Sequence, residues 1–302
     1  MLPGGSHLIV PGLRESDMTD PVKSIEDAAR ADSSGVVVDL EDGVAPAMKD
    51  RARERTVEAL AEWGETDRPV SVRMNGLETP HAFEDLAALH AAPSPPSAVV
   101  VPDVRGAADV RIVEAVLDAV DSPIGIVPLV ERPGAVFDAR AIAEASPRVA
   151  ALAFGSVDFR RSLGMPTLDA GADVDLPRYV VSMAASAAGV PALDTVYLHR
   201  EDLDGLRAET RRVRAMGFDG KFATGVEQVP VIEEAFTPSP EEVAHAERVV
   251  RAFREAGDDV GLIAVDGTTV DKPVVDEQTS LLARAKAAGL EVDPDLDLPD
   301  DG

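Results

Sequence analysis

The sequence predicts a (β/α)₈ TIM barrel with a C-terminal lid or arm segment, and three observations support this fold class. Eight short β-branched runs recur along the chain, each followed by a helix-like stretch. Runs such as GVVVDL and SAVVVP are apolar almost throughout, which is typical of parallel strands buried on both faces. The length of 302 residues suits a barrel of roughly 250 residues with an appendage. The first run lacks a Gly-rich dinucleotide fingerprint after it, which disfavours an open, doubly wound sheet.

The expected strands and helices alternate along the chain. The strands are His7–Val10, Gly35–Leu40, Val70–Met74, Ala98–Val101, Ile124–Val130, Val149–Phe154, Asp194–Tyr197 and Asp219–Ala223. The clearest amphipathic segments between them are Ala47–Ala61, Ala107–Val120 and Glu201–Met216. Eight strand-then-helix units predict a closed barrel.

Beyond the eighth strand, the SPEE motif at residues 239–242 has a helix N-cap, a proline at N1 and a glutamate at N3. It predicts a helix that runs to about Ala256. We therefore expect a catalytic barrel over residues 1–258. Residues 259–291 contain VDGTTVDKP and a further helical stretch, and we interpret them as a lid segment. Residues 292–302 form an acidic tail with little to bury, so we expect disorder there.

The composition is strongly acidic. The chain has 55 Asp and Glu against 29 Lys and Arg, a formal net charge of -26, which excludes nucleic acid as a partner. Only five of the cations are lysine. This pattern resembles halophilic proteins from salt-rich cytoplasm, where a screening length of about 3 Å at 1 M salt relieves self-repulsion. An ordinary acidic cytosolic protein is the alternative.

Cysteine is absent, so any metal must be held by oxygen or imidazole ligands. The five histidines show no ligand spacing. No apolar run approaches the ~18 residues of a membrane span, so we expect a cytoplasmic protein away from membranes. The pair Gly155-Ser156 lacks the context of a nucleophile elbow, which disfavours serine hydrolase chemistry.

Polar side chains gather where the expected strands end, which is where TIM barrels hold their catalytic residues. They are Arg14, Asp39, Glu41, Asp42, Arg73, Asn75, Asp103, Glu131, Asp158, Lys221 and Thr224. Two glycines, Gly155 and Gly225, lie among them. Glu131 and Asp158 follow adjacent strands, with neither cysteine nor histidine nearby. Oxygen-only ligation of this kind suits Mg²⁺. The sequence therefore predicts a magnesium site formed by these two carboxylates.

The three carboxylates of the DLED motif at the second strand are expected to hold metal-bound waters or to orient Arg73. An alternative for Asp39 and Glu41 is a loop ion pair with Lys49 or Arg51. The guanidinium of Arg73 suits a bidentate grip on a carboxylate or an α-keto acid.

Taken together, SHLIVPGxR, VVVDLEDGVAPAxKxxAR, VRMN and FGSVDF resemble the citrate lyase β-subunit family of the HpcH/HpaI aldolase group. GFDGKF, FTPSPEEVxxA and VDGTTVDKP extend the resemblance over residues 6–290. It implies a homotrimeric or homohexameric barrel that uses Mg²⁺ to cleave or form a 3-hydroxyacyl-CoA. Malyl-CoA, methylmalyl-CoA and citramalyl-CoA are the implied substrates, with an acyl-CoA and glyoxylate or pyruvate as the products.

The resemblance also implies residue roles. Glu131 and Asp158 match metal ligands, and Arg73 matches the arginine that grips the keto acid. Asp271 matches an aspartate that a neighbouring subunit contributes as acid or base, while Glu41 or Asp42 could transfer the proton through a held water. The implied substrate contacts are Arg14, Lys23, Asp39, Val157, Thr224 and Gly225, with Lys23 matching only if a short insertion is allowed.

Two departures fall in the substrate region. Asp103 stands where the family has the lysine of P-K-V, and ATGVEQ at residues 223–228 replaces A-I-H-P-x-Q, which removes a histidine. Three alternatives therefore stay open: a malyl-CoA thioesterase, a CoA-independent keto-acid aldolase and a non-catalytic homologue.

Overall fold

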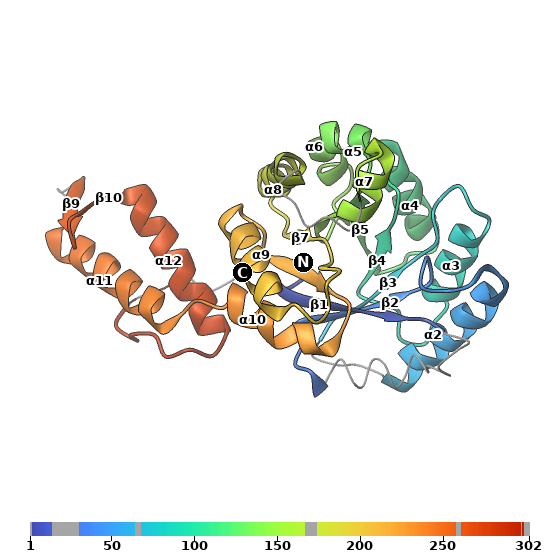
Figure 1. The fold of residues 1–302 in the computed structure, drawn as a ribbon, viewed down its shortest axis with the longest axis horizontal. Helices are drawn as coiled ribbons and strands as arrows, with labels where there is room; N and C mark the ends of the chain where they lie inside the picture. The colour runs from blue at the N-terminus through green and yellow to red at the C-terminus, as the bar shows by residue number, and fades with distance from the viewer. Residues whose placement is uncertain are drawn as a thin grey trace. The chain divides into compact units, whose positions relative to one another are not determined.

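The structure is a computed structural model that describes residues 2–13, 30–63, 68–166, 174–257, 261–296 and 298. The chain divides into two compact units, Met1–Phe236 and Thr237–Gly302 (Figure 1). Every helix in the described ranges is too short or too polar to span a bilayer.

Eight parallel strands close into a barrel in the first unit, and the predicted fold class is confirmed (Figure 1). The strands pair in chain order, and β1 pairs with β8 to complete the ring. They are β1 (Gly5–Pro11), β2 (Gly35–Asp39), β3 (Val70–Arg73), β4 (Ala98–Val101), β5 (Gly125–Val130), β6 (Leu152–Phe154), β7 (Ala192–Asp194) and β8 (Gly220–Ala223).

Helices cover the outside of the barrel between successive strands (Figure 1). They are α2 (Lys49–Trp63), α3 (His81–His90), α4 (Ala107–Ala119), α5 (Pro133–Phe137), α6 (Ala139–Ala143), α7 (Ser156–Leu163), α8 (Asp175–Ala188), α9 (Leu203–Ala215) and α10 (Val229–Phe236). Two 3₁₀ turns, Pro46–Met48 and Val226–Gln228, follow β2 and β8.

The strand β7 lies earlier in the chain than the sequence suggested. It spans Ala192–Asp194, whereas we expected Asp194–Tyr197. The β-branched residues after it do not join the ladder. Thr195 instead accepts a hydrogen bond from the Ser156 backbone N–H, and the carbonyl of Tyr197 accepts one from the side chain of Gln228. Hydrogen bonds to the start of α7 and to the 3₁₀ turn after β8 therefore hold a segment whose composition is typical of a strand.

Alternate strand residues face opposite sides of the barrel wall, as the two-residue period requires. Val37, Val100 and Leu129 belong to the cluster that fills the barrel interior. Val36 and Val38 pack in the larger core between the strands and the helices. A strand-end side chain an even number of positions from Val37, Val100 or Leu129 on its own strand therefore faces the barrel interior.

The second unit holds α11 (Pro240–Ala256), the hairpin of β9 (Leu262–Val265) and β10 (Thr268–Asp271), and α12 (Lys272–Ala287). The predicted capping box begins α11. Because α11 packs against α12, it belongs to this unit, and the domain boundary lies at Thr237 rather than at residue 259. Leu296, in the segment where we expected disorder, is 6% exposed and packs in this unit's core. Residues 297 and 299–302 lie outside the described residues.

Candidate active site at the carboxyl end of the barrel

The candidate site extends the inward-facing positions of three strands beyond the apolar interior. Asp39 follows Val37 by two residues on β2, and Glu131 follows Leu129 by two on β5. Arg73, the last residue of β3, is paired with Asp39 in the strand register. Their side chains therefore meet above the apolar core, at the end of the barrel where the strands finish.

Arg73 is held by two carboxylates. Its Nε and Nη2 atoms donate to the two oxygens of Asp39 at 2.8 and 2.7 Å, and its Nη1 lies 3.1 Å from Glu41. Asp39 also accepts the backbone N–H groups of Glu41 and Gly43, each at 2.8 Å. Burial opposes ionisation of Asp39, but these partners outweigh it and hold its pKa below the usual value. The guanidinium is thereby fixed in direction.

Lys49, the predicted alternative partner of Asp39 and Glu41, bonds elsewhere. Its ammonium donates to the backbone carbonyls of Leu40 and Glu41 at 2.8 and 2.7 Å. It therefore closes the turn after β2, while the carboxylates of that turn contact Arg73.

Glu131 is buried without a compensating cation. It is 5% exposed, and no lysine or arginine in the described part of the chain forms an ion pair with it. Its Oε1 accepts the backbone N–H of Asp103 at 2.7 Å. Burial raises the pKa of Glu131 to about 8. The Asp103 N–H and the charge of Arg73 oppose the shift, whereas the charges of Asp158 and Glu41 add to it. A buried carboxylate of this kind attracts either a proton or a metal cation.

Glu41 and Asp158 complete the acidic side of the site. Burial raises the pKa of Glu41 to about 7, although the charge of Arg73 opposes the shift. Asp158 lies in the first turn of α7 and pairs with the exposed Arg161 at 2.6 Å. The electrostatic effects on Glu41 and Glu131 both include Asp158, which places the three carboxylates in one neighbourhood.

A pocket opens beside these groups. Arg73, Gly155, Val157 and Asp158 line it together with apolar side chains from the barrel interior, which include Val100, Leu129 and Phe222. The polar groups lie at one side of an otherwise apolar cavity. Such a cavity suits a small ligand that carries one charged end.

The other predicted residues are not all part of this neighbourhood. Asp42 is exposed beside Glu41. The backbone N–H of Thr224 donates to Gln228, and Gly225 is buried between Thr224 and the 3₁₀ turn. Asp271 lies in the second unit, where its side chain caps α12 by accepting the Val274 N–H at 3.3 Å. Arg14 and Lys23 lie outside the described residues.

Two residues assigned to the rim from the sequence have other positions. Lys221 shares the parity of the outward-facing Ala223, and its ammonium is buried behind the barrel wall next to Asp194 at 2.6 Å. Asn75 donates from its backbone and its side chain to the buried Asp85, at 2.9 and 2.7 Å. Neither side chain is available to a substrate, so both interpretations were wrong.

Within the described residues, one group of three potential ligands lies close enough to share a cation: Asp50, His81 and Glu84. The guanidinium of Arg53 already lies among them, with 3.0 Å contacts to Asp50 and Glu84. An arginine therefore supplies the positive charge there. The residues of the candidate site fit Mg²⁺ better, because this ion needs only one or two carboxylates and Glu131 has no cationic partner.

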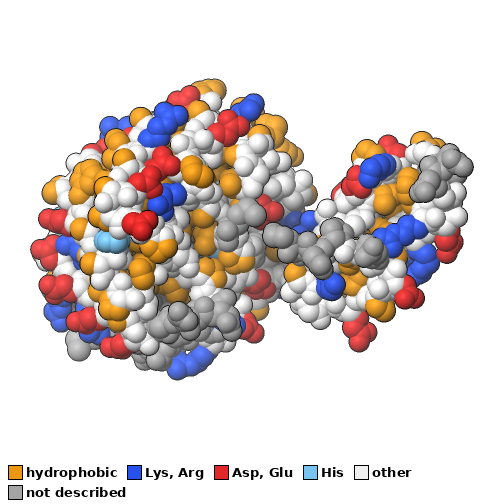
Figure 2. Space-filling view, turned by 180° about the vertical axis from the view of Figure 1, so that it is seen from behind, with side chains coloured by type: hydrophobic (Ala, Val, Ile, Leu, Met, Phe, Trp, Pro, Cys, Tyr) orange, Lys and Arg blue, Asp and Glu red, His pale blue; other side chains and the backbone are white. Residues whose placement is uncertain are grey.

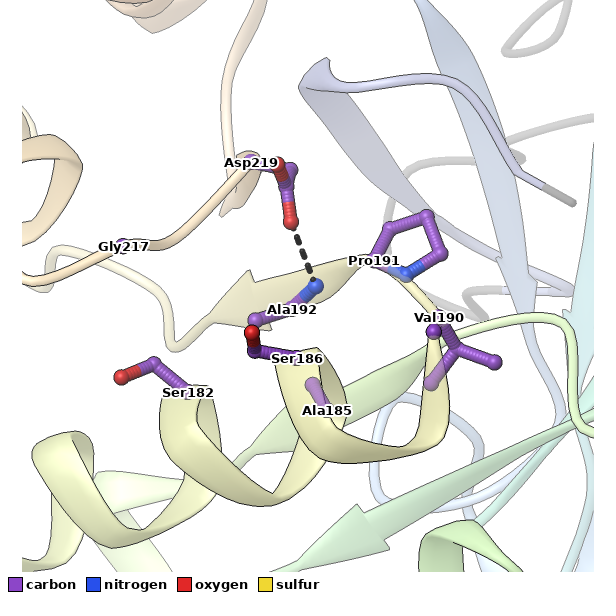
Figure 3. A pocket seen from close by; sticks show the side chains of 9 residues that line it. Ser182, Ala185, Ser186, Val190, Pro191, Ala192, Gly217 and Asp219 are labelled. Atoms are coloured by element: carbon purple, nitrogen blue, oxygen red, sulfur yellow. Dashed lines mark hydrogen bonds between the residues drawn. The ribbon is translucent and has the colours of Figure 1, made fainter. Parts of the chain in front are cut away.

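A second hollow lies at the opposite end of the barrel, where β7 and β8 begin (Figure 3). Its lining includes Ser182, Ser186 and Asp219. Figure 3 shows Asp219 pointing to the backbone of Ala192, whose N–H it accepts at 2.9 Å. This carboxylate thus fixes the start of β7, and we assign no chemistry to the hollow.

Sequence reasoning missed Arg132. It forms a two-pronged ion pair with Asp103 through Nε and Nη2, across the ends of β4 and β5. Asp103 was noticed as an anion where the related family carries a lysine. The signal that could have led to Arg132 was this lone carboxylate, which needs a cation nearby.

Comparison with known proteins agrees with the geometry. The sequence pattern described as HpcH/HpaI aldolase/citrate lyase matches residues 19–225. The chain belongs to this family. Citrate lyase subunit beta of Escherichia coli (strain K12) is 30% identical over 303 residues, which cover 94% of each chain. Mitochondrial citramalyl-CoA lyase of Mus musculus is 30% identical, over 82% of this chain and 78% of the mouse protein.

A solved structure is similar over nearly the whole length. The protein CitE of Mycobacterium tuberculosis, in complex with magnesium, acetoacetate and coenzyme A, has a TM-score of 0.79 and 31% identity. The match covers 94% of this chain and 98% of that one. The family is one of lyases that act on citrate or CoA-thioester substrates, as the names of these relatives state.

Proposed function

We propose that this lyase uses Mg²⁺ to cleave or form a carbon-carbon bond in a 3-hydroxyacyl-CoA such as malyl-CoA, methylmalyl-CoA or citramalyl-CoA. The products in the cleavage direction are an acyl-CoA and glyoxylate or pyruvate. The observation that carries the proposal is the buried, uncompensated Glu131 beside Asp158 and Arg73 at an apolar pocket. The names of the relatives, and the magnesium, acetoacetate and CoA of the solved neighbour, support the substrate class.

Glu131 and Asp158 would hold the metal. Bound Mg²⁺ would act as a Lewis acid on the carboxylate and hydroxyl oxygens of the substrate. Arg73 is fixed by Asp39 and Glu41, so it can bind the carboxylate of the keto-acid fragment without reorganising. The apolar walls exclude water and strengthen these charge interactions.

Proton transfer needs a group that titrates near neutral pH. Glu41, with its pKa raised to about 7, meets this requirement directly or through a water that it shares with Asp42. Asp271 of a neighbouring copy is the other candidate. It lies where a hairpin meets a helix, at a half-buried position. We propose Arg14 and Lys23 as contacts to the CoA moiety, and Thr224, Gly225 and Val157 as substrate contacts.

The test is an assay in molar salt with Mg²⁺ that offers malyl-CoA, methylmalyl-CoA, citramalyl-CoA and citryl-CoA. Keto acid and free thiol are followed separately. We expect keto acid, and a loss on the order of 1,000-fold in the Glu131→Gln variant because the Lewis acid contributes several kcal/mol. Glu144→Gln, which changes an exposed carboxylate at the C-cap of α6, is the matched control and should retain activity.

Other outcomes would select another function. Free thiol without keto acid identifies a thioesterase. Keto acid released from a free hydroxy acid, and not from its thioester, identifies a CoA-independent aldolase. No turnover of any of these substrates would contradict the proposal and favour a non-catalytic homologue.

We further propose that the chain assembles as a homotrimer or homohexamer. On α8, Leu176, Tyr179 and Met183 form an exposed apolar stripe, with 75%, 46% and 60% of each side chain accessible. The adjoining α5 adds Phe137, which is 88% exposed. Exposed apolar side chains at this spacing favour contact with another protein surface. Light scattering should give a trimer or hexamer mass for the wild type and a smaller one for Met183→Glu.

The acidic surface supports a salt-rich cytoplasm as the working environment. Acidic side chains are spread over the visible face of the barrel (Figure 2), and the net charge is -26. Repulsion among them weakens when salt screens the charges. The melting temperature should therefore rise between dilute and molar salt, and a constant value would indicate an ordinary acidic protein.

A further inference from the structure

We propose that Asp103 and Arg132 form a clasp that positions Glu131, so that this carboxylate binds the metal through Oε2 alone. The inference rests on the proposed metal site. It adds two residues outside the predicted ligand and substrate set, and it assigns different tasks to the two oxygens of the ligand.

A hydrogen bond holds Oε1 of Glu131. The backbone N–H of Asp103 donates to this oxygen at 2.7 Å. A charge-assisted bond of this length fixes the carboxylate group about its last torsion. Since Oε1 already binds a donor from the β4 end, Oε2 is the oxygen with greater freedom to bind a cation.

The backbone conformation of Asp103 aims this N–H. Asp103 has a φ of 57°, a left-handed conformation that side-chain-bearing residues adopt rarely. Aspartate tolerates it better than most residues, but the conformation still needs support. Arg132 supplies the support, because its guanidinium binds both oxygens of the Asp103 carboxylate.

The order of residues along the chain couples this ion pair to the ligand. Arg132 directly follows Glu131 in the chain, so the ion pair joins the residue after the ligand to the residue whose N–H holds the ligand. Two contacts thus join the ends of β4 and β5: the hydrogen bond from the Asp103 N–H to Glu131 and the ion pair between Asp103 and Arg132. Displacement of either strand end would break both contacts.

Gly155 lies on the other side of the Glu131 carboxylate. A Cβ atom on Gly155 would lie 2.5 Å from Oε2 and 2.8 Å from the Cβ of Glu131. The Glu131 side chain therefore lies directly against the backbone of Gly155, which has no side chain to block it. Together with the Asp103 N–H, this wall confines the carboxylate while Oε2 stays on the side of the pocket that Gly155 and Asp158 line.

The test measures metal binding without substrate, by Mn²⁺ electron paramagnetic resonance and by Mg²⁺ calorimetry. Asp103→Ala and Arg132→Met should weaken binding about 10- to 100-fold, as loss of a residue that orients a ligand typically does. Asp103→Asn should lose less, because asparagine tolerates the left-handed conformation. Asp103→Gly separates loss of the clasp from backbone strain, since glycine lacks the carboxylate but adopts the left-handed conformation freely. Circular dichroism checks that each variant is folded.

Asp118→Ala is the matched control. It breaks another partly exposed ion pair, Arg148–Asp118, at the opposite end of the barrel, and should leave the dissociation constant unchanged. The clasp is refuted if Asp103→Ala, Asp103→Gly and Arg132→Met all bind Mn²⁺ like the wild type while Glu131→Ala does not bind it. Unchanged binding in Glu131→Ala would instead refute the metal site on which the inference depends.

Discussion

Two groups of buried or half-buried carboxylates lie near strand ends of the same barrel, and they differ in how their charge is compensated. Glu131 and Glu41 face the interior at the ends of β5 and β2. Asp194 and Glu209 lie behind the wall, between β7, β8 and the helices α8 and α9. The inner group, Glu131 and Glu41, has raised pKa values. In the outer group, Asp194 and Glu209, the pKa of Glu209 falls to about 2.

The share of cations explains the difference, because Arg73 serves both Glu41 and Asp39, whereas two cations serve the outer pair. The ammonium of Lys221 lies 2.6 Å from Asp194 and 2.8 Å from Glu209. Arg178 contacts the same two carboxylates at 2.9 and 3.3 Å. Burial disfavours the charge of Glu209, but the two cations outweigh it. The outer group is thus a neutral cluster of two acids and two bases.

The same barrel wall thus carries charged groups of two kinds, one that stabilises the fold and one that is free to bind a ligand. The outer cluster carries its own counterions and is complete as it stands. The inner group leaves Glu131 without an ion-pair partner among the described residues, next to a pocket that Arg73, Gly155 and Asp158 line. A buried carboxylate left in this state is a candidate ligand for a metal that arrives from solution.

The largest effect on stability should come from breaking the outer cluster. Lys221→Met leaves Asp194 and Glu209 with one cation instead of two, and should lower the free energy of unfolding by about 3–5 kcal/mol. Urea denaturation measures this. Lys272→Met, which breaks an exposed pair with Asp276, should change it by less than about 1 kcal/mol. Equal effects of the two substitutions would contradict a tightly compensated cluster.

The same substitution should have opposite signs in the two groups. Without metal at about pH 9, Glu131→Gln should raise the free energy of unfolding by roughly 1–3 kcal/mol, because it removes an uncompensated buried charge. Glu209→Gln should lower it by a similar amount, because it leaves Lys221 and Arg178 undercompensated. Denaturant titration of each variant measures its change in the free energy of unfolding. Changes of the same sign in the two variants would contradict the difference between the groups.

The two groups also predict opposite responses to pH. The folded-state pKa values of Glu131 and Glu41 are raised to about 8 and about 7, so their contribution to stability is complete below the unfolded value near 4.5. It is lost as the pH rises through about 7 to 8. The loss is at most about 1.4 kcal/mol per pH unit for each group. Glu209 behaves in the opposite way, since its pKa is lowered to about 2. Its contribution is complete above about pH 4.5 and is lost as the pH falls through 2.

Thermal denaturation of the metal-free protein should therefore show a melting temperature that falls between about pH 5 and pH 8 and then levels off. Saturating Mg²⁺ should remove most of this fall, because it binds the ionised carboxylates. A fall that Mg²⁺ does not alter would assign the pH dependence to other groups.

The smallest effect should come from the exposed cluster around Arg53. Glu84→Gln should change the Mg²⁺ dissociation constant less than about twofold, because an arginine already compensates this carboxylate. Calorimetry checks this. A large loss of affinity would move the metal site to Asp50, His81 and Glu84.

Much of the fold and part of the site followed from the sequence. Buried apolar runs fix the strands because a parallel barrel needs them on both faces, and the strand ends then point to Asp39, Arg73 and Glu131. Lys221 was misplaced because strand-end position alone was considered, whereas its parity with Ala223 directs it outward. The predicted position of β7 was shifted because Thr195 and its neighbours have strand composition but bond to the start of α7 and to the 3₁₀ turn after β8.

The Asp103–Arg132 contact could not be predicted, because it depends on a left-handed residue after β4 and on a register across two strands. These are features of the folded chain rather than of either segment. Asp39 illustrates the same limit, since its choice of Arg73 over Lys49 follows from the pairing of β2 with β3.

Proton release on metal binding tests the central claim most directly. Mg²⁺ is titrated into the metal-free protein at pH 7 in buffers of different ionisation enthalpy, for the wild type and for Glu131→Gln. With the pKa of Glu131 near 8, the wild type should release about one proton per Mg²⁺ bound. The variant should bind the ion far more weakly. Tight binding without proton release would show that the inner carboxylates are already ionised, which would contradict the account.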